Sequence, residues 1–499
     1  GITKTRHDVA QGKICPAPLL RYCHWLPLTF HSDRSGIEAA YEQKIILMLK
    51  LPRIYSWLGL NLLVLVNLQA ESFTERFEQL WEAASAEQRY ALLYDLPKGG
   101  DLHNHAPGSN RPEWMLAIAK DPKRNGGDTL WTRIRFASPL DAIAPPVFCH
   151  TIRNVSYNAL PPEVQAEYVR LDQLTEAEET IWADAFRLES EGEGRSEFFN
   201  VIWERLGDTL TNPQIRLELL TDNIKAFAAE GVCYWEPQYG PQDLCTNDGE
   251  PISIAKGVAM TEARLAEPDI QETGMVIRFQ KTILRFAPNA EQLTRDLYAF
   301  VDKYKGRWVG LNMAGIEEKG QGYPERFREV LRELRAKYPT MPLSFHAGEM
   351  DGPDKNIRET LLLGATRIGH GVNILGDPDT LLHLQMSDRV LIEINLISNQ
   401  LLEYVLDINK HPFPELLRTG VPVCLNTDDR GMWDSNMTDE YFTAMKHFNL
   451  SWPELTQLAR YSLEHAFVED PVKTTLLEDY EKRLIAFEKR YSRGTIKNT

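Results

Sequence analysis

Four polar clusters occur in a fixed order along this chain of 499 residues, and their side chains are of types that bind metal ions. The first cluster contains His103 and His105, which are two residues apart. Residues at i and i+2 lie on the same face of a strand, so both imidazoles can reach one ion. The later clusters are Ser-Phe-His-Ala-Gly-Glu at 344–349, Arg-Ile-Gly-His-Gly at 367–371 and Asn-Thr-Asp-Asp at 426–429. Their order predicts one site assembled from distant parts of the chain.

Three imidazoles and one carboxylate form a suitable ligand set for zinc. His103, His105, His346 and Asp428 supply three nitrogens and one oxygen, and leave a coordination position open for water. Zinc lowers the pKa of the water that it binds to about 7, which makes a nucleophile available near neutral pH. The sequence therefore predicts a hydrolytic zinc site.

Three further residues are candidates for proton transfer and substrate binding. Glu349 follows His346 by three residues, so it can donate a proton beside the metal without being a ligand. His370 lies between two glycines that permit close approach, and it can orient the water or accept its proton. Asp429 is a candidate for substrate binding. Taken singly, such a histidine is more often structural and an Asp-Asp pair more often forms a turn. Because all four polar clusters occur together in this order, the functional interpretation is favoured.

A short apolar run precedes each polar cluster, and helical patterns separate the runs. Besides the run before His103, the apolar segments are Gly231–Pro237, Met275–Leu284, Trp308–Met313, Met341–Phe345, Thr366–Ile368, Arg389–Asn395 and Val421–Leu425. The helical patterns include Ala290–Lys305, Tyr323–Lys337, Ile357–Leu363 and Asp377–Met386. Strands that alternate with helices indicate parallel βαβ units. Eight of them predict an α/β fold, the (β/α)8 TIM barrel, whose active site lies at the carboxyl ends of the strands.

Two regions surround this pattern. Apolar residues at helical spacing over 74–93 predict a helical N-terminal extension, and 110–228 reads mostly as a helical insertion after the first strand. The insertion is a candidate for substrate contacts or for a homodimer interface. We expect one barrel domain over 71–499.

Composition excludes several classes of protein. A formal net charge of −16 without a basic run argues against nucleic-acid binding. The six cysteines form no Cys-x-x-Cys motif, which argues against a zinc ribbon or a thioredoxin-like site. Cys233 and Cys424 lie in apolar runs and are expected to be buried thiols. The pairs Cys233–Cys245 and Cys15–Cys23 are the disulfides to consider in an oxidising compartment.

The segment 48–70 resembles a secretory signal peptide. Basic residues at 50 and 53 precede the largely apolar Ile54–Leu68, and Ala70 is followed by a polar residue. We expect Met48 to be the initiator, Ala70 the last residue removed, and 1–47 an upstream segment of uncertain nature. A membrane span needs roughly 20 apolar residues, so none is expected in the mature chain. The alternative is a helix that packs on the barrel. The mature protein would be secreted or periplasmic in the first case and cytoplasmic in the second.

The motifs resemble those of the adenosine deaminase family of metal-dependent hydrolases over roughly residues 75–490. The matching stretches are PKGGDLHNH at 97–105, NMAG at 312–315, SFHAGE at 344–349, RIGHG at 367–371, LIEINLISN at 391–399 and HPFPELLRTGVPVCLNTDD at 411–429. The resemblance implies that Glu349 protonates purine N1, that His370 aligns and helps to deprotonate the water, that Asp429 bonds N7, and that Gly315 contacts N3. It also implies a single metal, because WVGLNMAG contains no bridging lysine.

One motif departs from the family pattern. The family commonly has His-Leu-Asp-Gly after the first strand, whereas this chain has His105-Ala106-Pro107-Gly108. The family's aspartate is associated with the 5′-hydroxyl of the sugar, and Pro107 cannot make that contact. The metal chemistry is unaffected, but the preferred purine is left open. The candidate signal peptide is similar to that of the secreted, growth-factor-related branch.

The sequence thus predicts zinc-dependent deamination of adenosine or a related 6-aminopurine to the 6-oxo product. Two alternatives remain. The first is a barrel metallohydrolase that acts on an amide, a lactone, a phosphoester or an adenine-type substrate, and the second is an extracellular binding or signalling protein.

Overall fold

The computed structural model describes residues 73–135, 147–188, 192–317 and 322–492. The chain divides into two units, Gly1–Gln69 and Ala70–Thr499, and every described residue belongs to the second. The candidate signal peptide at 48–70 lies outside the described residues, so it stays a prediction, as does a homodimer. Among the described helices, none is long and apolar enough to cross a membrane.

Parallel strands form a closed barrel in the described part of the chain. They are β1 (Gly99–Asp101), β5 (Val232–Trp235), β6 (Val276–Ile277), β7 (Phe279–Leu284), β8 (Trp308–Ala314), β9 (Leu343–Ala347), β10 (Arg367–His370), β11 (Leu391–Ile394) and β12 (Val423–Leu425). One set pairs in the order β1-β5-β6 and the other in the order β12-β11-β10-β9-β8-β7. Residue 278 alone separates β6 from β7, so the two occupy one position in the barrel.

Parallel bridges join the two sets of strands. Gln238, beyond β5, bridges to Gln280 of β7, and Asn104, beyond β1, bridges to Asp428, beyond β12. The last strand therefore lies beside the first. With β6 and β7 counted together, eight strand positions close in sequence order within the described residues. The (β/α)8 expectation is confirmed.

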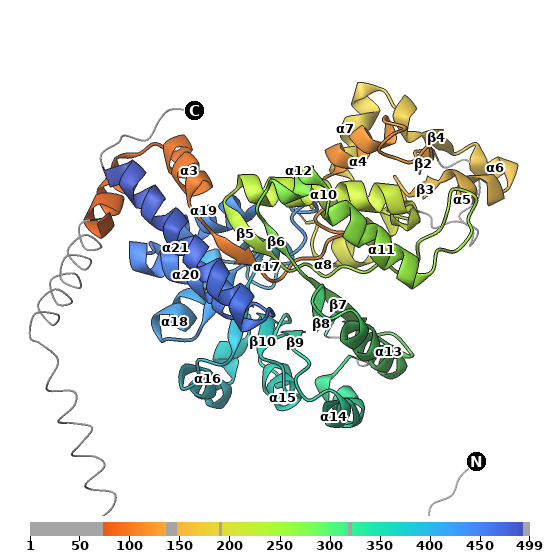
Figure 1. Cartoon of the computed structure of the whole chain (residues 1–499). Helices are drawn as coiled ribbons and strands as arrows, with labels where there is room; N and C mark the ends of the chain where they lie inside the picture. Colours follow the sequence, from red (N-terminus) through yellow and green to blue (C-terminus); the bar gives the residue numbers. More distant parts are fainter. Residues whose placement is uncertain (1–72, 136–146, 189–191, 318–321, 493–499) are drawn as a thin grey trace, which may run out of the picture. The chain divides into compact units, whose positions relative to one another are not determined.

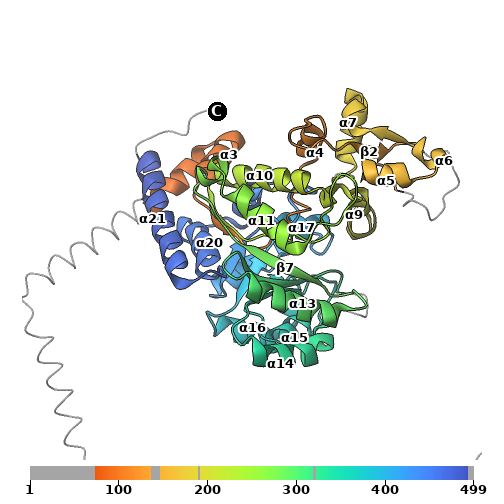
Figure 2. The same cartoon turned by 45° about the vertical axis from the view of Figure 1, so that its right-hand side comes forward.

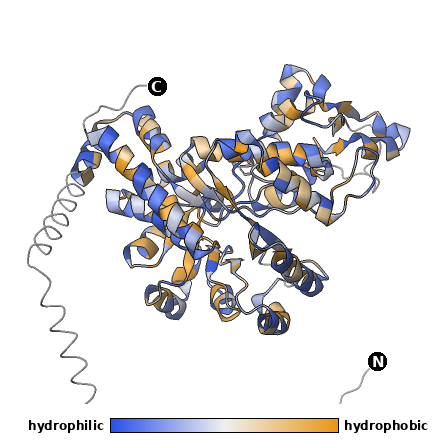
Figure 3. Cartoon of the chain, in the orientation of Figure 1, coloured by the Kyte–Doolittle hydropathy of each residue, from blue (hydrophilic) through white to orange (hydrophobic). Residues whose placement is uncertain are grey.

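Helices cover the outside of the strands (Figures 1 and 2). They are α10 (Pro213–Ala229), α11 (Ile254–Leu265), α12 (Pro268–Gln271), α13 (Ala290–Lys303), α14 (Arg328–Lys337), α15 (Asn356–Leu362), α16 (Pro378–Gln385), α17 (Leu396–Leu401), α18 (Phe413–Arg418), α19 (Met437–Phe448), α20 (Trp452–Glu464) and α21 (Asp470–Ser492). Hydrophobic and hydrophilic residues alternate along α13 to α16 in Figure 3, as in helices with one face on a core. The strands are buried on both faces, which explains their nearly continuous apolar sequences.

The N-terminal extension consists of two helices rather than one. Residues 73–83 are helical, and α3 (Ala86–Asp95) begins after Ser85, whose side chain forms a capping box with Gln88. Phe73 and Phe77 each lie 4.8 Å from the Trp452 ring and anchor the first helix on α20.

The insertion between β1 and β5 contains a small antiparallel sheet, which the sequence analysis did not anticipate. Its strands β2 (Leu130–Arg133), β3 (Thr151–Arg153) and β4 (Tyr168–Arg170) pair in the order β3-β2-β4. The helical elements of the insertion are α4 (Pro112–Ala119), α5 (Asn154–Ala159), α6 (Pro162–Gln165), α7 (Glu176–Asp184), α8 (Arg195–Glu197), the π-helix η2 (Phe198–Ile202) and α9 (Trp203–Arg205). A second hydrophobic cluster, which includes Trp182 and Ile202, packs the insertion against Leu402, Met432 and Trp433 of the barrel.

The cysteines in the described residues are free thiols. Cys233 and Cys424 are buried, as expected, and the Cys233–Cys245 disulfide is not formed. Cys15 and Cys23 lie outside the described residues.

Candidate active site

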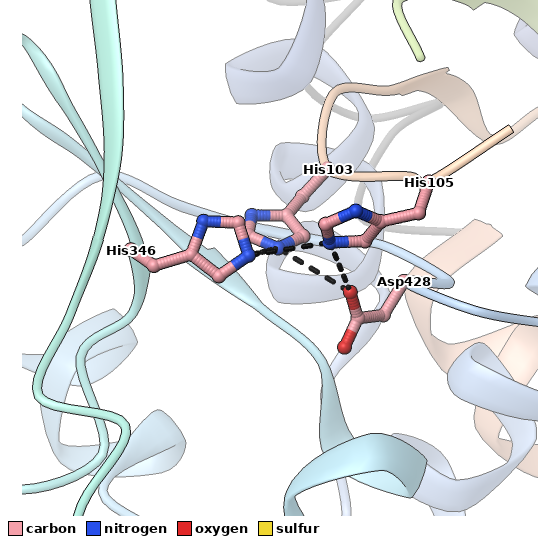
Figure 4. Close-up of side chains that lie close together, drawn as sticks. All are labelled: His103, His105, His346 and Asp428. Carbon is pink, nitrogen blue, oxygen red and sulfur yellow. Dashed lines mark hydrogen bonds and ion pairs between the residues drawn. The ribbon is translucent and has the colours of Figure 1, made fainter. Parts of the chain in front are cut away.

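The four candidate metal ligands converge at the carboxyl ends of the strands (Figure 4). His103 Nε2 and His105 Nε2 lie 3.1 and 3.3 Å from His346 Nε2. Asp428 Oδ1 lies 3.4 Å from His103 Nε2 and 3.2 Å from His105 Nε2. The donor atoms of all four lie within 4.8 Å of one another. The structure therefore brings together four residues that span more than 300 positions of sequence.

The spacing and the charge of this cluster fit a metal ion. In a tetrahedral site with bonds of about 2.0–2.1 Å, neighbouring ligand atoms are about 3.3 Å apart, which is close to the observed separations. Burial lowers the pKa of His103, but its interactions with Asp428 and Glu393 outweigh burial and raise that pKa to about 10. The carboxylates of Asp428 and Glu393 thus favour a positive charge at His103. His103, His105, His346 and Asp428 are the residues that could hold the ion.

A buried chain of charges supports His103 from inside the barrel. Glu393 Oε2 accepts a hydrogen bond of 2.8 Å from His103 Nδ1, and its other oxygen lies 2.6 Å from Arg367 Nε. Arg367 also donates to Glu236 over 2.8 Å, and none of these side chains is exposed. When His103 is neutral, as a metal ligand must be, Glu393 holds its remaining proton on Nδ1, and its Nε2 lone pair faces the other ligands.

Backbone conformation at the site is unusual at two non-glycine residues. Asp428 has φ 52° and His370 has φ 67°, both in the left-handed region. Such conformations cost free energy and persist where the surroundings enforce them, often at functional sites. Gly369 leaves room for the His103 ring, because a Cβ at residue 369 would lie 2.4 Å from His103 Cε1.

Glu349 is buried beside His370, with 3.6 Å between Glu349 Oε2 and His370 Nε2. Burial, followed by the charges of Asp428 and Glu317, raises the pKa of Glu349 well above its ordinary value. A carboxyl group with such a raised pKa keeps its proton near neutral pH and can act as a general acid.

Hydrogen bonds fix the orientation of His370. Phe413 N donates to His411 Nδ1, so neutral His411 carries its proton on Nε2 and donates it to Asn399 Oδ1. Asn399 Nδ2 then donates to His370 Nδ1 over 2.9 Å. Burial lowers the pKa of His370 well below its ordinary value, so the imidazole is neutral. Its proton therefore lies on Nε2, the nitrogen that faces Glu349. This arrangement favours a role in orienting water over a role in removing its proton.

Asp429 and Gly315 are the two residues that the sequence predicts to contact the substrate. Asp429 is buried, and its Oδ1 has no hydrogen-bond partner among the described residues. Burial and the charge of Asp428 raise the pKa of Asp429 well above its ordinary value. Gly108 makes room for this carboxyl group, because a Cβ there would lie 1.7 Å from Asp429 Oδ1. Gly315 directly follows β8 and has φ 110°.

A cavity of about 290 Å³ extends from the metal-ligand cluster toward the insertion. Near the cluster it is lined by His105, Pro107 and Gln238, and farther away by Trp203, Arg216 and Lys281. Lys281 is 5% exposed, and burial together with the nearby Arg216 lowers its pKa to about 7. The residues that line the cavity include no carboxylate.

Sequence reasoning missed most residues that position the site. Glu393, Asn399 and His411 act through hydrogen bonds to His103 and His370. A glutamate inside the apolar run Arg389–Asn395 was a detectable signal, since buried charges are rare without a partner. Glu317 and Arg285 carried no comparable signal.

A parallel barrel with a cluster of three histidines and an aspartate at the carboxyl ends of its strands defines a hydrolase of the metal-dependent barrel class. The model of the adenosine deaminase family matches residues 171–483. The adenosine deaminase of Shewanella halifaxensis is 39% identical over 271 residues, which are 53% of this chain and 76% of that protein. This chain belongs to the adenosine deaminase family and is an aminohydrolase.

Two solved structures share the fold at low identity. An amidohydrolase from Burkholderia ambifaria with bound zinc aligns with a TM-score of 0.57 at 19% identity, over 82% of this chain and 96% of that one. Arabidopsis ADAL complexed with IMP aligns with a TM-score of 0.57 at 21% identity, over 79% of this chain and 99% of that one.

Proposed function

We propose that this protein is a zinc-dependent aminohydrolase that converts adenosine, or a close 6-aminopurine relative, to the 6-oxo product and ammonia. The observation that carries the proposal is the convergence of His103, His105, His346 and Asp428, with Glu349 buried close by. Zinc in the related amidohydrolase from Burkholderia ambifaria supports the choice of metal.

The side chains of this protein divide the work of deamination. When bound, zinc would supply the Lewis acidity that ionises water near neutral pH. Glu349 donates a proton to N1 of the purine, which makes C6 electrophilic. His370 orients the attacking water through Nε2–H. Asp429 donates a hydrogen bond to N7, and the backbone N–H of Gly315 donates one to N3. The oxygen of water bonds to C6 as the bond between C6 and the amino nitrogen breaks. One proton of the water leaves with the amino group as ammonia, and the other restores the proton that Glu349 gave to N1.

A panel of substrates tests this proposal. We expect the change in ultraviolet absorbance that accompanies deamination with at least one of adenosine, deoxyadenosine, adenine or AMP. Dialysis against a chelator should abolish turnover, and added zinc should restore it, because removal of the metal removes the activation of water. An amide, a lactone and a phosphoester serve as negative substrates. Activity on one of these, with none on any 6-aminopurine, would overturn the proposal.

A nucleoside 5′-monophosphate is a second candidate substrate. Arg216 places a positive charge in the cavity that leads to the site, and Lys281, whose pKa is about 7, can take up a proton when an anion binds beside it. Pro107 stands where the family commonly has a negative charge. Lys281 Nζ hydrogen-bonds to Gln242 Oε1, and no carboxylate lines the cavity to neutralise it. The related ADAL is complexed with the nucleotide IMP.

Comparison of AMP with adenosine tests the second candidate. If the phosphate binds at Lys281, the substitution Lys281→Gln should lower kcat/KM for AMP by about 10- to 100-fold, the value of one charge-assisted hydrogen bond. It should leave kcat/KM for adenosine nearly unchanged, so adenosine is the internal control. Equal effects on both substrates, or preference of the wild-type protein for adenosine, would exclude this candidate.

A further inference from the structure

Glu317 is a buried carboxylate that binds the turn between His346 and Glu349. Its Oε1 accepts a hydrogen bond of 3.1 Å from the backbone N–H of Glu349. Its Oε2 accepts one of 3.1 Å from the backbone N–H of Gly348 and one of 2.8 Å from Asn356 Nδ2. Only 1% of Glu317 is exposed. A single side chain therefore holds two consecutive amides of the turn, one of which belongs to the proposed general acid.

The turn cannot easily adopt another shape. Gly348 has φ 77°, and a Cβ there would lie 2.5 Å from Asn373 Oδ1 and 2.7 Å from Ile357 Cδ1. Since Glu317 binds the amides on both sides of the Gly348 Cα, it fixes the directions of two peptide planes. The Cα–Cβ bond of Glu349 takes its direction from the second of these planes.

Arg285 secures the same turn through a different group. Its Nη2 donates to the backbone oxygens of Met313 and His346, at the ends of β8 and β9. Arg285 Nη1 lies 4.0 Å from Glu317 Oε1, and both side chains are fully enclosed. The arginine thus balances the buried charge of Glu317, which would otherwise be costly. Together the two residues hold the segment that contains both a metal ligand and the proposed acid.

We propose that Glu317 is a positioning residue for catalysis: its carboxylate holds the 346–349 turn so that the Glu349 carboxyl group is directed at the substrate. This inference rests on the proposed function. It assigns to Glu317 an effect that passes through Glu349 and not through the metal. A loop anchor without a catalytic role would stabilise the protein but would not influence turnover selectively.

The substitution Glu317→Gln separates these two roles. An amide of the same shape has one acceptor oxygen, and its NH₂ group faces an N–H donor in place of the second acceptor. The amide of Gly348 or Glu349 then loses its partner, and the turn shifts. We expect kcat to fall by about 10- to 100-fold, because small displacements of a catalytic group have effects of this size. We expect KM and zinc content to remain within about twofold of wild type.

A double-mutant cycle with Glu349→Gln provides the decisive measurement. If Glu317 acts through Glu349, adding Glu317→Gln to Glu349→Gln should lower kcat by less than about threefold, since residues that act as a unit have non-additive effects. If the reduction of kcat in the double variant equals the product of the reductions in the two single variants, the proposal is wrong. It is also wrong if Glu317→Gln alone retains its zinc and has the kcat of wild type. A wild-type protein inactive on every 6-aminopurine would instead refute the proposed function.

Asn356→Ala is the second variant, and it decides the matter if Glu317→Gln does not fold. Asn356 donates to Glu317 from the start of α15 and touches neither amide of the turn. Its loss should lower kcat by several-fold in the wild-type background, because the Glu317 carboxylate loses one of its three hydrogen bonds. It should have no effect on kcat in the Glu349→Gln background. Equal losses in the two backgrounds would contradict the proposal.

Discussion

Replacement of Glu349 by glutamine should give a folded, metal-loaded protein whose kcat is lower by about 100- to 10,000-fold, the range associated with general acid catalysis. The amide has the size of the carboxyl group and can still donate a hydrogen bond, but it has no acidic proton to transfer to the purine ring. The backbone N–H of residue 349, which donates to Glu317, is retained. Initial rates by ultraviolet absorbance and zinc content by atomic absorption provide the two measurements.

Asp351→Asn is a matched control for this substitution. Asp351 lies two residues away in the sequence, but its carboxylate is exposed and pairs with Arg195 over 2.9 Å. We expect kcat of this variant to equal that of wild type. Loss of a general acid should lower kcat by at least about 100-fold. If the Glu349→Gln variant instead retained a rate within about threefold of wild type, Glu349 would not be the proton donor.

Asp428→Ala should lose both metal and activity. The substitution removes the single oxygen ligand of the cluster and leaves three imidazoles without a counter-charge. We expect zinc affinity to fall by more than about 100-fold, since loss of residues that merely orient metal ligands already costs about 10- to 100-fold. Zinc retained after dialysis and residual turnover are the quantities to measure. Unchanged zinc content would show that Asp428 has a structural role.

Asp428→Asn controls for backbone conformation at this position. Residue 428 has φ 52°, a conformation that asparagine tolerates better than alanine. Asparagine can also accept the hydrogen bond that Ser398 donates to Asp428 Oδ2. If the charge of the ligand is what matters, the asparagine variant should have the thermal midpoint of metal-free wild type and should not regain zinc binding. Recovery of zinc in Asp428→Asn would instead attribute the loss in Asp428→Ala to the backbone.

The barrel and its ligands could be predicted from sequence because their signals are local. Each barrel strand is a short apolar run such as Arg389–Asn395, and the polar residues that follow it must lie at one end of a parallel barrel. The type and spacing of His103 and His105 indicate a pair of metal ligands. The structure brings them to His346 and Asp428 as the sequence predicted.

The residues around the ligands could not be predicted in the same way, because their roles depend on contacts that sequence does not encode locally. Glu317 binds backbone amides, and every residue except proline offers an amide. The antiparallel sheet of the insertion was not predicted for a similar reason. Its strands have three or four residues, too few for a periodic pattern, and the buried Arg153–Asp128 pair behind them joins residues 25 positions apart.

The seam between β1 and β12 has a consequence for how the protein matures. Asp428 N donates to His103 O, and His105 N donates to Asp428 O, so the ligands lie on the two edges that close the barrel. During synthesis, His103 and His105 emerge from the ribosome more than 300 residues before Asp428. The complete site therefore cannot form until the final strand has joined the first. Metal binding would then be completed only at the end of folding, and the bound ion would link the first strand of the barrel to the last.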